Sequence, residues 1–376
     1  MWRKRALLSP MPGRSDTVNA TRPLRPSRHA ANPSARSRVV IASPAASVVF
    51  SAAMPGEFDL IQRFLACFPR ARVPVGPGDD CAVLAPFKGA LCVTTDAVVE
   101  DVHFTRAAFS AADIGHKALA VNLSDLAAMG ATPRWFVCAL ALPRDFPARE
   151  VSAMGRGMAA LAKAHRIMLV GGNFTSAREL SVTLTVTGEL SSAPLTRAGA
   201  RPGDLLYVSG TLGDARLGLQ QLQAGVPGIR RSAAVRRQRR PEPRIALGKL
   251  AARFASAGMD VSDGLAQDLG HLCAASRVGV ELELDRLPLS PAVRAALGPE
   301  GALRGGEDYE LLLAVPPSRM QAFERACARA GQEVTRMGVL TRERTLRIRD
   351  AGGHVLTPPA GFDHFARTGR QIRPDD

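Results

Sequence analysis

The chain has 376 residues, a net charge of +15 and 46% apolar residues, values typical of a globular protein with about two domains. Its six cysteines show neither C-x-x-C nor zinc-type spacing, which argues against a disulfide framework and favours reduced thiols in a cytoplasmic protein. No run of about 18 apolar residues occurs, so the sequence predicts no membrane-spanning segment.

The positive charge is concentrated in two stretches. Residues 1–53 contain nine Lys and Arg and one acid, and the stretch 230–244 contains seven arginines against Glu242. The second stretch has no aromatic residues on which bases could stack, so we expect no nucleic-acid partner. The alternative is a solvated loop or helix end, and the sequence indicates no function for it.

Residues 1–53 are rich in Arg, Pro, Ser and Ala and lack hydrophobic periodicity, which predicts a disordered basic extension. Three explanations remain open: a targeting segment, a genuine disordered arm, or translation from upstream of the true start. We favour the last, because Met54 directly precedes the credible domain opening P-G-E-F-D-L-I.

Helices and strands are predicted to alternate from residue 57 onward. Apolar residues at helical spacing from Phe58 to Leu65 predict a first helix. Further helices are predicted at 113–129 and 149–165, and strands at 91–95, 135–142, 167–170 and 180–190. The strand at 91–95 is expected to end at Asp96, and the strand at 167–170 to run into the pair Gly171-Gly172.

A polar, Gly- and Pro-rich join at 191–203 predicts two domains, at 54–192 and 196–367, followed by a tail at 368–376. After the join we expect strands at 205–209, 278–284, 310–315 and 333–340. Helices are expected at 214–223, 244–256 and 317–330, and another begins at Leu265. Long strands mixed with helices indicate an α/β fold made of α+β layers with mixed sheets.

Many of the scarce acidic residues lie in short clusters flanked by Gly, Ser or Thr. The clusters are G-P-G-D-D-C-A with Asp79 and Asp80, T-T-D with Asp96, N-L-S-D-L with Asp125, M-D-V-S-D-G with Asp260 and Asp263, and G-G-E-D-Y with Glu307 and Asp308. Each one has an ordinary alternative as a turn, a helix cap or an exposed helix face. Their joint occurrence favours a site for Mg²⁺ and phosphates assembled from both halves of the chain.

Three details add to this interpretation. Asp125 interrupts an apolar helix, where an unpaired carboxylate should not be buried. Asp260 and Asp263 precede the helix at Leu265, whose first N–H groups could bind an anion. The glycine pair before Asn173 would let backbone N–H groups approach a phosphate.

The sequence contains no P-loop, protein-kinase or Ser-His-Asp motif. An enzyme that acts on phosphates with this sequence would therefore depend on metal ions to neutralise the phosphate charge.

Seven motifs occur in a fixed order: G-D-D-C-A, T-T-D-x-x-V-E-x-x-H-F, K-A-L-A-V-N-L-S-D-L-A-A-M-G-A, G-T-L-G-D-A, D-V-S-D-G-L, G-G-E-D-Y-E-L and G-F-D-H-F. This order resembles the thiamine-monophosphate kinases, a family of the aminoimidazole-ribonucleotide-synthetase-like superfamily. The resemblance implies a two-domain fold and a homodimer whose N-terminal domains form the interface. It also implies transfer of a phosphoryl group from ATP to thiamine monophosphate with several Mg²⁺ ions.

The resemblance assigns site residues position by position. It implies metal ligands at Asp80, Thr94, Thr95, Asp96, Asp125, Asn173, Asp260 and Asp263. ATP contacts are implied at Gly172, Asn173, Arg197 and Ser262, and thiamine-phosphate contacts at His103, Glu307 and Phe362. No catalytic general base is expected, because the acceptor is itself a phosphate anion. Asp79 and Asp308 are expected in turns or supporting positions.

One residue departs from the family pattern, and other functions compete. Asn173 stands where the family has Asp, so we expect metal ions to bind there more weakly or in smaller number.

Enzymes of the same fold that make aminoimidazole ribonucleotide or selenophosphate are the nearest alternative functions. Residues 1–56 lack the cysteine expected of a selenophosphate enzyme. A basic nucleic-acid-binding or scaffold protein is the alternative from another class, and it predicts salt-sensitive oligonucleotide binding.

Overall fold

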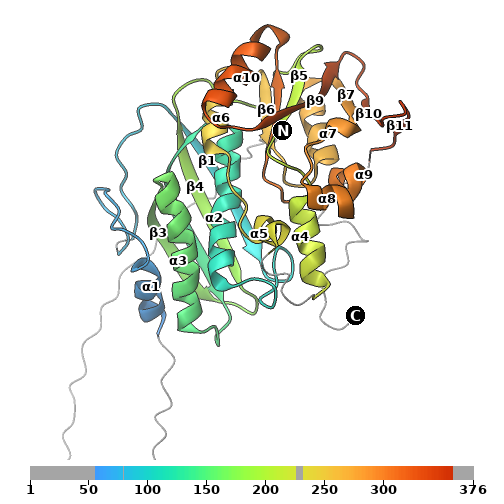
Figure 1. The fold of residues 1–376 in the computed structure, drawn as a ribbon. Helices are drawn as coiled ribbons and strands as arrows, with labels where there is room; N and C mark the ends of the chain where they lie inside the picture. The colour runs from blue at the N-terminus through green and yellow to red at the C-terminus, as the bar shows by residue number, and fades with distance from the viewer. Residues whose placement is uncertain (1–55, 79, 226–231, 359–376) are drawn as a thin grey trace, which may run out of the picture. The chain divides into compact units, whose positions relative to one another are not determined.

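Two β-sheets organise the structure, one from each half of the described chain (Figure 1). The computed structural model describes residues 56–78, 80–225 and 232–358. The predicted extension at 1–53, Asp79, Phe362 and the tail at 368–376 therefore lie outside the described residues. Within those ranges, no helix is both long enough and apolar enough to cross a membrane.

Helices and strands alternate along most of this chain. The helices are α1 (Glu57–Leu65), α2 (Ala111–Ala128), α3 (Ala148–His165), α4 (Asp214–Gln223), α5 (Ala233–Arg239), α6 (Ile245–Ala251), α7 (Leu265–Ser276), α8 (Pro291–Ala296), α9 (Gly298–Leu303) and α10 (Met320–Arg329). The strands are β1 (Ala90–Val99), β2 (Thr132–Leu142), β3 (Met168–Ser176), β4 (Ser181–Leu190), β5 (Leu205–Ser209), β6 (Ala257–Asp260), β7 (Gly279–Glu283), β8 (Leu311–Val315), β9 (Val334–Thr341), β10 (Leu346–Arg349) and β11 (Val355–Leu356).

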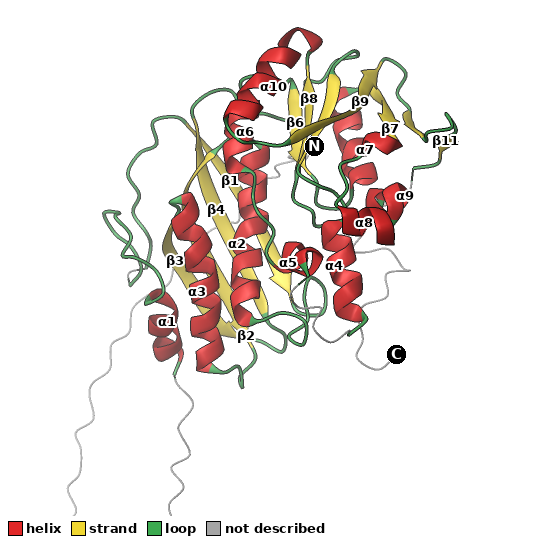
Figure 2. Ribbon diagram, viewed as in Figure 1, coloured by secondary structure: helices red, strands yellow, loops and turns green. Residues whose placement is uncertain are grey.

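The first sheet has the strand order β1-β4-β2-β3, and α2 and α3 cover one of its faces (Figure 2). β4 pairs antiparallel with β1 and β2, whereas β2 and β3 run parallel. Side chains alternate along β4, and Val182, Leu184 and Val186 are buried on the helix side. On the other face, Leu91 and Val93 of β1 are 51% and 56% exposed. The sheet therefore has one packed face and one face with exposed apolar side chains.

The second sheet has the strand order β11-β10-β7-β9-β5-β8-β6. Its pairings are antiparallel except for that of β7 with β10. Every residue of the central strands β5 and β8 is buried, so both faces of the sheet are covered. Leu206 and Leu312 face the core that contains α7, whereas Tyr207 and Leu313 face the core shared with the first sheet.

Helix α2 connects the two halves of the structure. It contacts β1, β4, α3 and α6, and it also reaches β6 of the second sheet. Two crossings are so close that they require glycine. A Cβ on Gly157 of α3 would lie 2.0 Å from the carbonyl oxygen of Ala112, and one on Gly248 of α6 would lie 1.9 Å from that of Ala127. Polar residues of α2 are thereby held between the two sheets.

Most predicted elements are confirmed, and β5 and α4 have the predicted bounds. Two predicted strand ends are wrong. β1 continues past Asp96 to Val99, and β3 continues through the glycine pair to Ser176. In both strands the backbone pairing persists where the apolar run stops, since Asp96 pairs with Leu184 and Asn173 with Ala139.

The prediction of a solvated loop or helix end at 230–244 is confirmed only in part, because Arg236 and Arg240 are exposed but other residues of the stretch are not. Residues 233–239 form α5, and Gln238 and Arg239 are buried. The helix predicted at 244–256 is the shorter α6, because the chain turns after Ala251 to enter β6. The elements β6, α8, α9, β10 and β11 were not predicted from the sequence.

Candidate active site

A cavity of about 550 Å³ is lined by residues from both halves of the chain. Asp96 of β1 and Asp125 of α2 come from the first half, whereas Asp260 of β6 and Asp263 come from the second. Arg197, on the connection between the two sheets, also lines the cavity. The structure therefore brings together four of the acids that the sequence marked as metal ligands.

These carboxylates affect one another electrostatically. Burial, and then the negative charges of Asp125 and Asp263, raise the pKa of Asp96 to about 6. Burial and the charge of Asp125 likewise raise the pKa of Asp260 to about 7. Carboxylates that raise the pKa of their neighbours are close enough to repel one another when ionised. The cluster is therefore a concentration of negative charge that suits a divalent cation.

Hydroxyl groups orient two of the carboxylates. Thr94 Oγ1 donates to Asp125 Oδ2 at 2.5 Å, and Ser124 Oγ donates to Asp260 Oδ2 at 2.7 Å. Burial raises the pKa of Asp125, whereas the hydrogen bond from Thr94 and the charge of Arg197 oppose that rise. Asp125 is thus the acid that receives both a hydrogen bond and the influence of a nearby cation.

Strand alternation separates Thr95 from the rest of its motif. Thr94 contacts Asp125, and Asp96 lines the cavity, so both face the helix side of β1. Thr95 lies on the other face of the strand, where its Oγ1 donates to the carbonyl oxygen of Leu184 at 2.9 Å. Within one chain, the hydroxyl of Thr95 is therefore not part of the acid cluster.

The acid cluster fits Mg²⁺ by its chemistry, because its donors are carboxylate oxygen atoms. In the part of the chain that the structure describes, no three His, Cys, Asp or Glu side chains surround a common point that would hold a metal ion. This is compatible with Mg²⁺, which usually keeps several waters and binds one or two carboxylates together with substrate phosphates.

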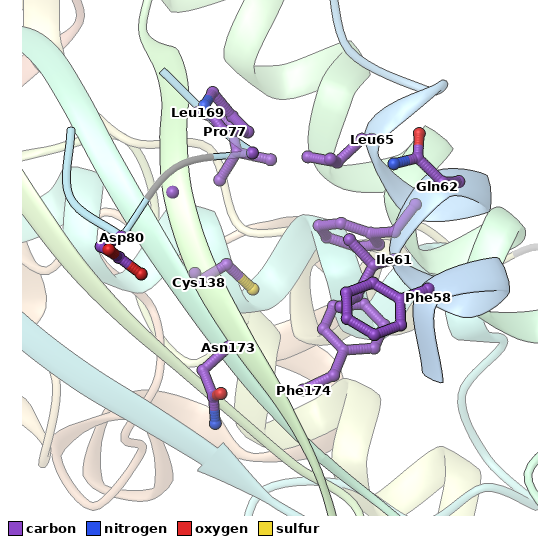
Figure 3. Close-up of a pocket in the computed structure, with 14 residues that line it drawn as sticks. Phe58, Ile61, Gln62, Leu65, Pro77, Asp80, Cys138, Leu169, Asn173 and Phe174 are labelled. Carbon is purple, nitrogen blue, oxygen red and sulfur yellow. The ribbon is translucent and has the colours of Figure 1, made fainter. Parts of the chain in front are cut away.

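Three other predicted residues lie in a second cavity, of about 600 Å³. Asp80, Gly172 and Asn173 line it together with apolar side chains of α1 such as Phe58. Figure 3 shows the side chain of Phe174 beside α1, with Asp80 and Asn173 on the other side of the cavity. β1 and β3 are opposite edges of the first sheet, three strand spacings or roughly 14 Å apart. The structure therefore divides the predicted metal and ATP residues between two cavities.

Gly172 has a packing reason to be glycine. A Cβ at this position would lie 2.1 Å from the carbonyl oxygen of Cys138 on β2. The close strand pairing explains the residue without a phosphate, and the predicted ATP contact at Gly172 stays a prediction.

Three backbone N–H groups just before α7 are occupied by a side chain of the helix. Asp268 Oδ2 accepts hydrogen bonds from the backbone N–H groups of residues 262, 263 and 264 at 3.0, 3.1 and 3.2 Å. Anion binding by the first N–H groups of α7 itself stays a prediction. The predicted residue Ser262 still lines the cavity.

The predicted substrate residues His103 and Glu307 line the cavity that holds the acid cluster. The backbone N–H of Val99 donates to His103 Nδ1 at 3.1 Å, so a neutral ring carries its proton on Nε2. Glu307 has a φ of 65°, and its carboxylate lies 2.6 Å from the ammonium group of Lys117. Both predicted contacts are therefore positioned at one cavity.

Asp308 has the supporting role that was expected of it. Its carboxylate accepts from the backbone N–H groups of Gly213 and Ala215 at 2.7 and 3.2 Å. These groups lie at the start of α4, so Asp308 fixes the N-terminal end of a helix that lines the cavity.

Lys117, Gln238 and Tyr309 belong to the site but were missed in the sequence. Lys117 is 1% exposed and ion-paired with Glu307, and Gln238 and Tyr309 line the cavity. Lys117 carried a usable signal, because it interrupts the same apolar helix as Asp125. Gln238 gave no such signal, because it lies among arginines that the sequence predicts to be exposed to solvent.

Comparison with known proteins places these motifs in a family. Residues 78–190 match the model for the N-terminal domain of AIR synthase related protein, and residues 201–351 match the model for its C-terminal domain. Thiamine-monophosphate kinase of Escherichia coli (strain K12) is 41% identical over 327 residues, which cover 83% of this chain and 98% of that protein.

Solved structures agree with this assignment. Thiamine-monophosphate kinase from Stenotrophomonas maltophilia K279a has a TM-score of 0.72 and 39% identity, and the match covers 80% of this chain and 98% of that one. AaThiL complexed with AMPPCP and TMP has a TM-score of 0.68 and 33% identity, with 82% and 97% of the two chains covered. The chain therefore belongs to the thiamine-monophosphate kinase family, and its fold, its ordered motifs and its acid cluster agree with this membership.

Proposed function

We propose that the cavity of the acid cluster transfers the γ-phosphoryl group of ATP to the phosphate of thiamine monophosphate, which gives thiamine diphosphate. Family membership makes the chain an ATP-dependent kinase. The observation that supports the site is the juxtaposition of four carboxylates with Arg197 and Glu307 around one cavity. The complex of AaThiL with AMPPCP, an ATP analogue, and TMP agrees with both substrates.

The residues suggest a direct transfer without a general base. The acceptor is a phosphate monoester whose second pKa is about 6, so its oxygen is already an anion at pH 7. The chemical difficulty is the repulsion between two anionic substrates. Asp96, Asp125, Asp260 and Asp263 would hold Mg²⁺, which when bound supplies the positive charge that offsets this repulsion. Arg197 adds a fixed positive charge at the same cavity.

The proposed activity is tested with the full chain, ATP, Mg²⁺ and thiamine monophosphate, with chromatographic detection of thiamine diphosphate. We expect formation of thiamine diphosphate in step with ADP, and none when thiamine replaces the monophosphate. Hydrolysis of ATP without thiamine diphosphate would argue for one of the phosphate-activating enzymes of the same fold.

A homodimer through the first sheet is part of the proposal. Leu91, Val93 and Val137 are exposed apolar side chains on the face of the sheet that α2 and α3 do not cover, and they are 51%, 56% and 37% exposed. Exposed apolar side chains gathered on one face are typical of protein interfaces. A second copy on this face would also offer its Asp80 and Asn173, which one chain holds in a separate cavity. The proposed domains, 54–192 and 196–367, assign this interface to the first domain.

We expect Val93→Asp to dissociate the dimer. Each copy would place a carboxylate in an apolar interface, close to the same carboxylate of the second copy. Because like charges at an interface cost several kcal/mol, the dissociation constant of the dimer should rise at least about a hundredfold. Sedimentation velocity measures the change. The matched control is Val355→Asp, because Val355 is 55% exposed but lies on β11 of the other sheet. A Val93→Asp protein that stays dimeric at low concentration would contradict the proposed interface.

A metal role for Asn173 leads to a further prediction. An amide offers Mg²⁺ a neutral oxygen, so Asn173→Asp should lower the Mg²⁺ concentration at half-maximal rate severalfold by adding a charge. Rates measured over a Mg²⁺ titration test this, with Asn173→Ala as the control that removes the oxygen. An unchanged Mg²⁺ requirement in both variants would count against any metal role at residue 173.

We also propose that the protein works in the cytoplasm. All six cysteines are free thiols in the structure, as a reducing compartment would keep them. The proposed substrate contact at Phe362 lies outside the described residues.

The alternative of a nucleic-acid-binding protein gains no support from the arginine-rich stretch. Most of its described arginines pair with groups of the protein.

A further inference from the structure

Glu307 is held by buried side chains from two different helices. Lys117 Nζ of α2 lies 2.6 Å from Glu307 Oε1, and Gln238 Nε2 of α5 donates to Glu307 Oε2 at 2.5 Å. Lys117 and Gln238 are 1% and 2% exposed, whereas the Glu307 side chain is 25% exposed and lines the cavity. The carboxylate is therefore fixed from the protein interior and accessible from the cavity.

The same lysine links Glu307 to the other residue proposed to contact the substrate. Lys117 Nζ donates to the carbonyl oxygen of His103 at 3.2 Å, in addition to its ion pair with Glu307. Lys117 offsets part of the charge of Glu307, whereas Gln238 adds a hydrogen bond without adding positive charge. A neutral donor at residue 238 thus orients the carboxylate without further reducing its attraction for a cationic ligand.

The arginine-rich stretch keeps Gln238 in place. Helix α5 has only seven residues and contacts α2 and α4, between which it lies in Figure 1. Arginines on either side of Gln238 anchor it: Arg237 pairs with Glu310, and Arg239 donates to the carbonyl oxygen of Ala108. Arg240 Nε lies 2.5 Å from Asp113 Oδ1 at the start of α2. Ion pairs and this hydrogen bond therefore reinforce a short helix that also buries Ala234 and Val235.

We propose that Gln238 is a positioning residue for thiamine monophosphate, which acts by holding the Glu307 carboxylate against the cationic thiazolium part of the substrate. The inference rests on the proposed function. A carboxylate attracts that cationic part and repels the phosphate, so it favours an orientation of the substrate in which the phosphate turns away from Glu307 and towards a cation of the cavity such as Arg197. The arginine-rich stretch has the role of presenting Gln238 to Glu307.

The test measures steady-state kinetics of the full chain for the wild type, Gln238→Met, Glu307→Gln and the double variant. Methionine has nearly the length of glutamine but cannot donate, and hydrogen bonds to charged groups are strong. We expect Gln238→Met to raise KM for thiamine monophosphate at least about tenfold, with kcat and KM for ATP within about threefold. In the Glu307→Gln background the same change should raise KM less than about threefold, because the partner it positions is already altered.

Two further variants complete the design. Gln332→Met removes a glutamine whose amide bonds only the nearby carbonyl of Ala330, away from the cavity, and should leave all constants unchanged. Gln238→Glu preserves shape if the methionine variant fails to fold. Its carboxylate would repel Glu307, so KM for thiamine monophosphate should again rise at least about tenfold.

Each contrary outcome has a distinct meaning. An unchanged KM in both Gln238 variants overturns the inference while the wild-type activity upholds the proposed function. Effects that multiply in the double variant show that Gln238 contacts the substrate itself, which also overturns a positioning role. A wild-type chain that makes no thiamine diphosphate overturns the proposed function, and this inference falls with it.

Discussion

An Asp125→Asn enzyme is expected to form thiamine diphosphate at least about tenfold more slowly than the wild type, even at saturating Mg²⁺. Asp125 is the carboxylate whose charge raises the pKa of both Asp96 and Asp260, so it lies at the centre of the proposed metal site. Asparagine keeps the shape and can still accept the hydrogen bond from Thr94. The loss is therefore one of charge, and losses at preorganised electrostatic sites are about 10²-fold or more.

Stability measurements separate this effect from misfolding. Removal of Asp125's charge relieves repulsion within the cluster, so the free energy of unfolding without Mg²⁺ should stay the same or rise. Asp285→Asn, at an exposed acid in the second half of the chain, is the matched control and should keep full activity. Near wild-type rates for Asp125→Asn at saturating Mg²⁺ would refute the metal role of this residue.

The arginine-rich stretch should contribute strongly to stability through Arg244. Glu310 is fully buried; Arg244 Nε donates to its Oε2 at 2.7 Å, and Ser209 Oγ donates to the same oxygen at 2.5 Å. Arg244→Met leaves this carboxylate with Arg237 as its remaining ion-pair partner. Because the loss of one partner from a buried ion pair costs about 3–5 kcal/mol, we expect the free energy of unfolding to fall by about 3 kcal/mol.

Urea unfolding checks this expectation, with Arg347→Met as the control. Arg347 pairs with Glu343 at 2.5 Å, but both side chains are well exposed, and exposed pairs contribute about 0–1 kcal/mol. A loss below about 1 kcal/mol for Arg244→Met would show that Glu310 is stabilised adequately by its other partners.

Much of the fold could be predicted from local patterns in the sequence. Helix α2 is preceded by Ser110, which accepts a hydrogen bond from the backbone N–H of Asp113, and it shows the continuous apolar pattern of a buried helix. Strand β4 shows the strict alternation of a half-buried strand. Helix α5 could not be predicted in this way, because Gln238 and its neighbouring arginines find their partners more than 65 residues away, at Glu307 and Glu310.

The candidate site was predictable to the extent that polar residues interrupt apolar segments. Asp125 was identified on that basis and Asp260 from its Ser- and Gly-flanked cluster before a helix, and both lie in the acid cluster. The sequence did not indicate that Asp80 and Asn173 line a different cavity, because this depends on β1 and β3 being at opposite edges of one sheet. It also did not indicate that Asp268 occupies the N–H groups before α7.

The most direct test of metal-assisted direct transfer is a labelling experiment with [γ-³²P]ATP, Mg²⁺ and thiamine monophosphate on the full chain. If the phosphate of the substrate attacks the γ-phosphorus directly, the label should appear in the terminal phosphate of thiamine diphosphate, and none should remain on acid-quenched protein at any time. A labelled protein that forms and decays as thiamine diphosphate appears would contradict the account, because it would require a nucleophile on the enzyme.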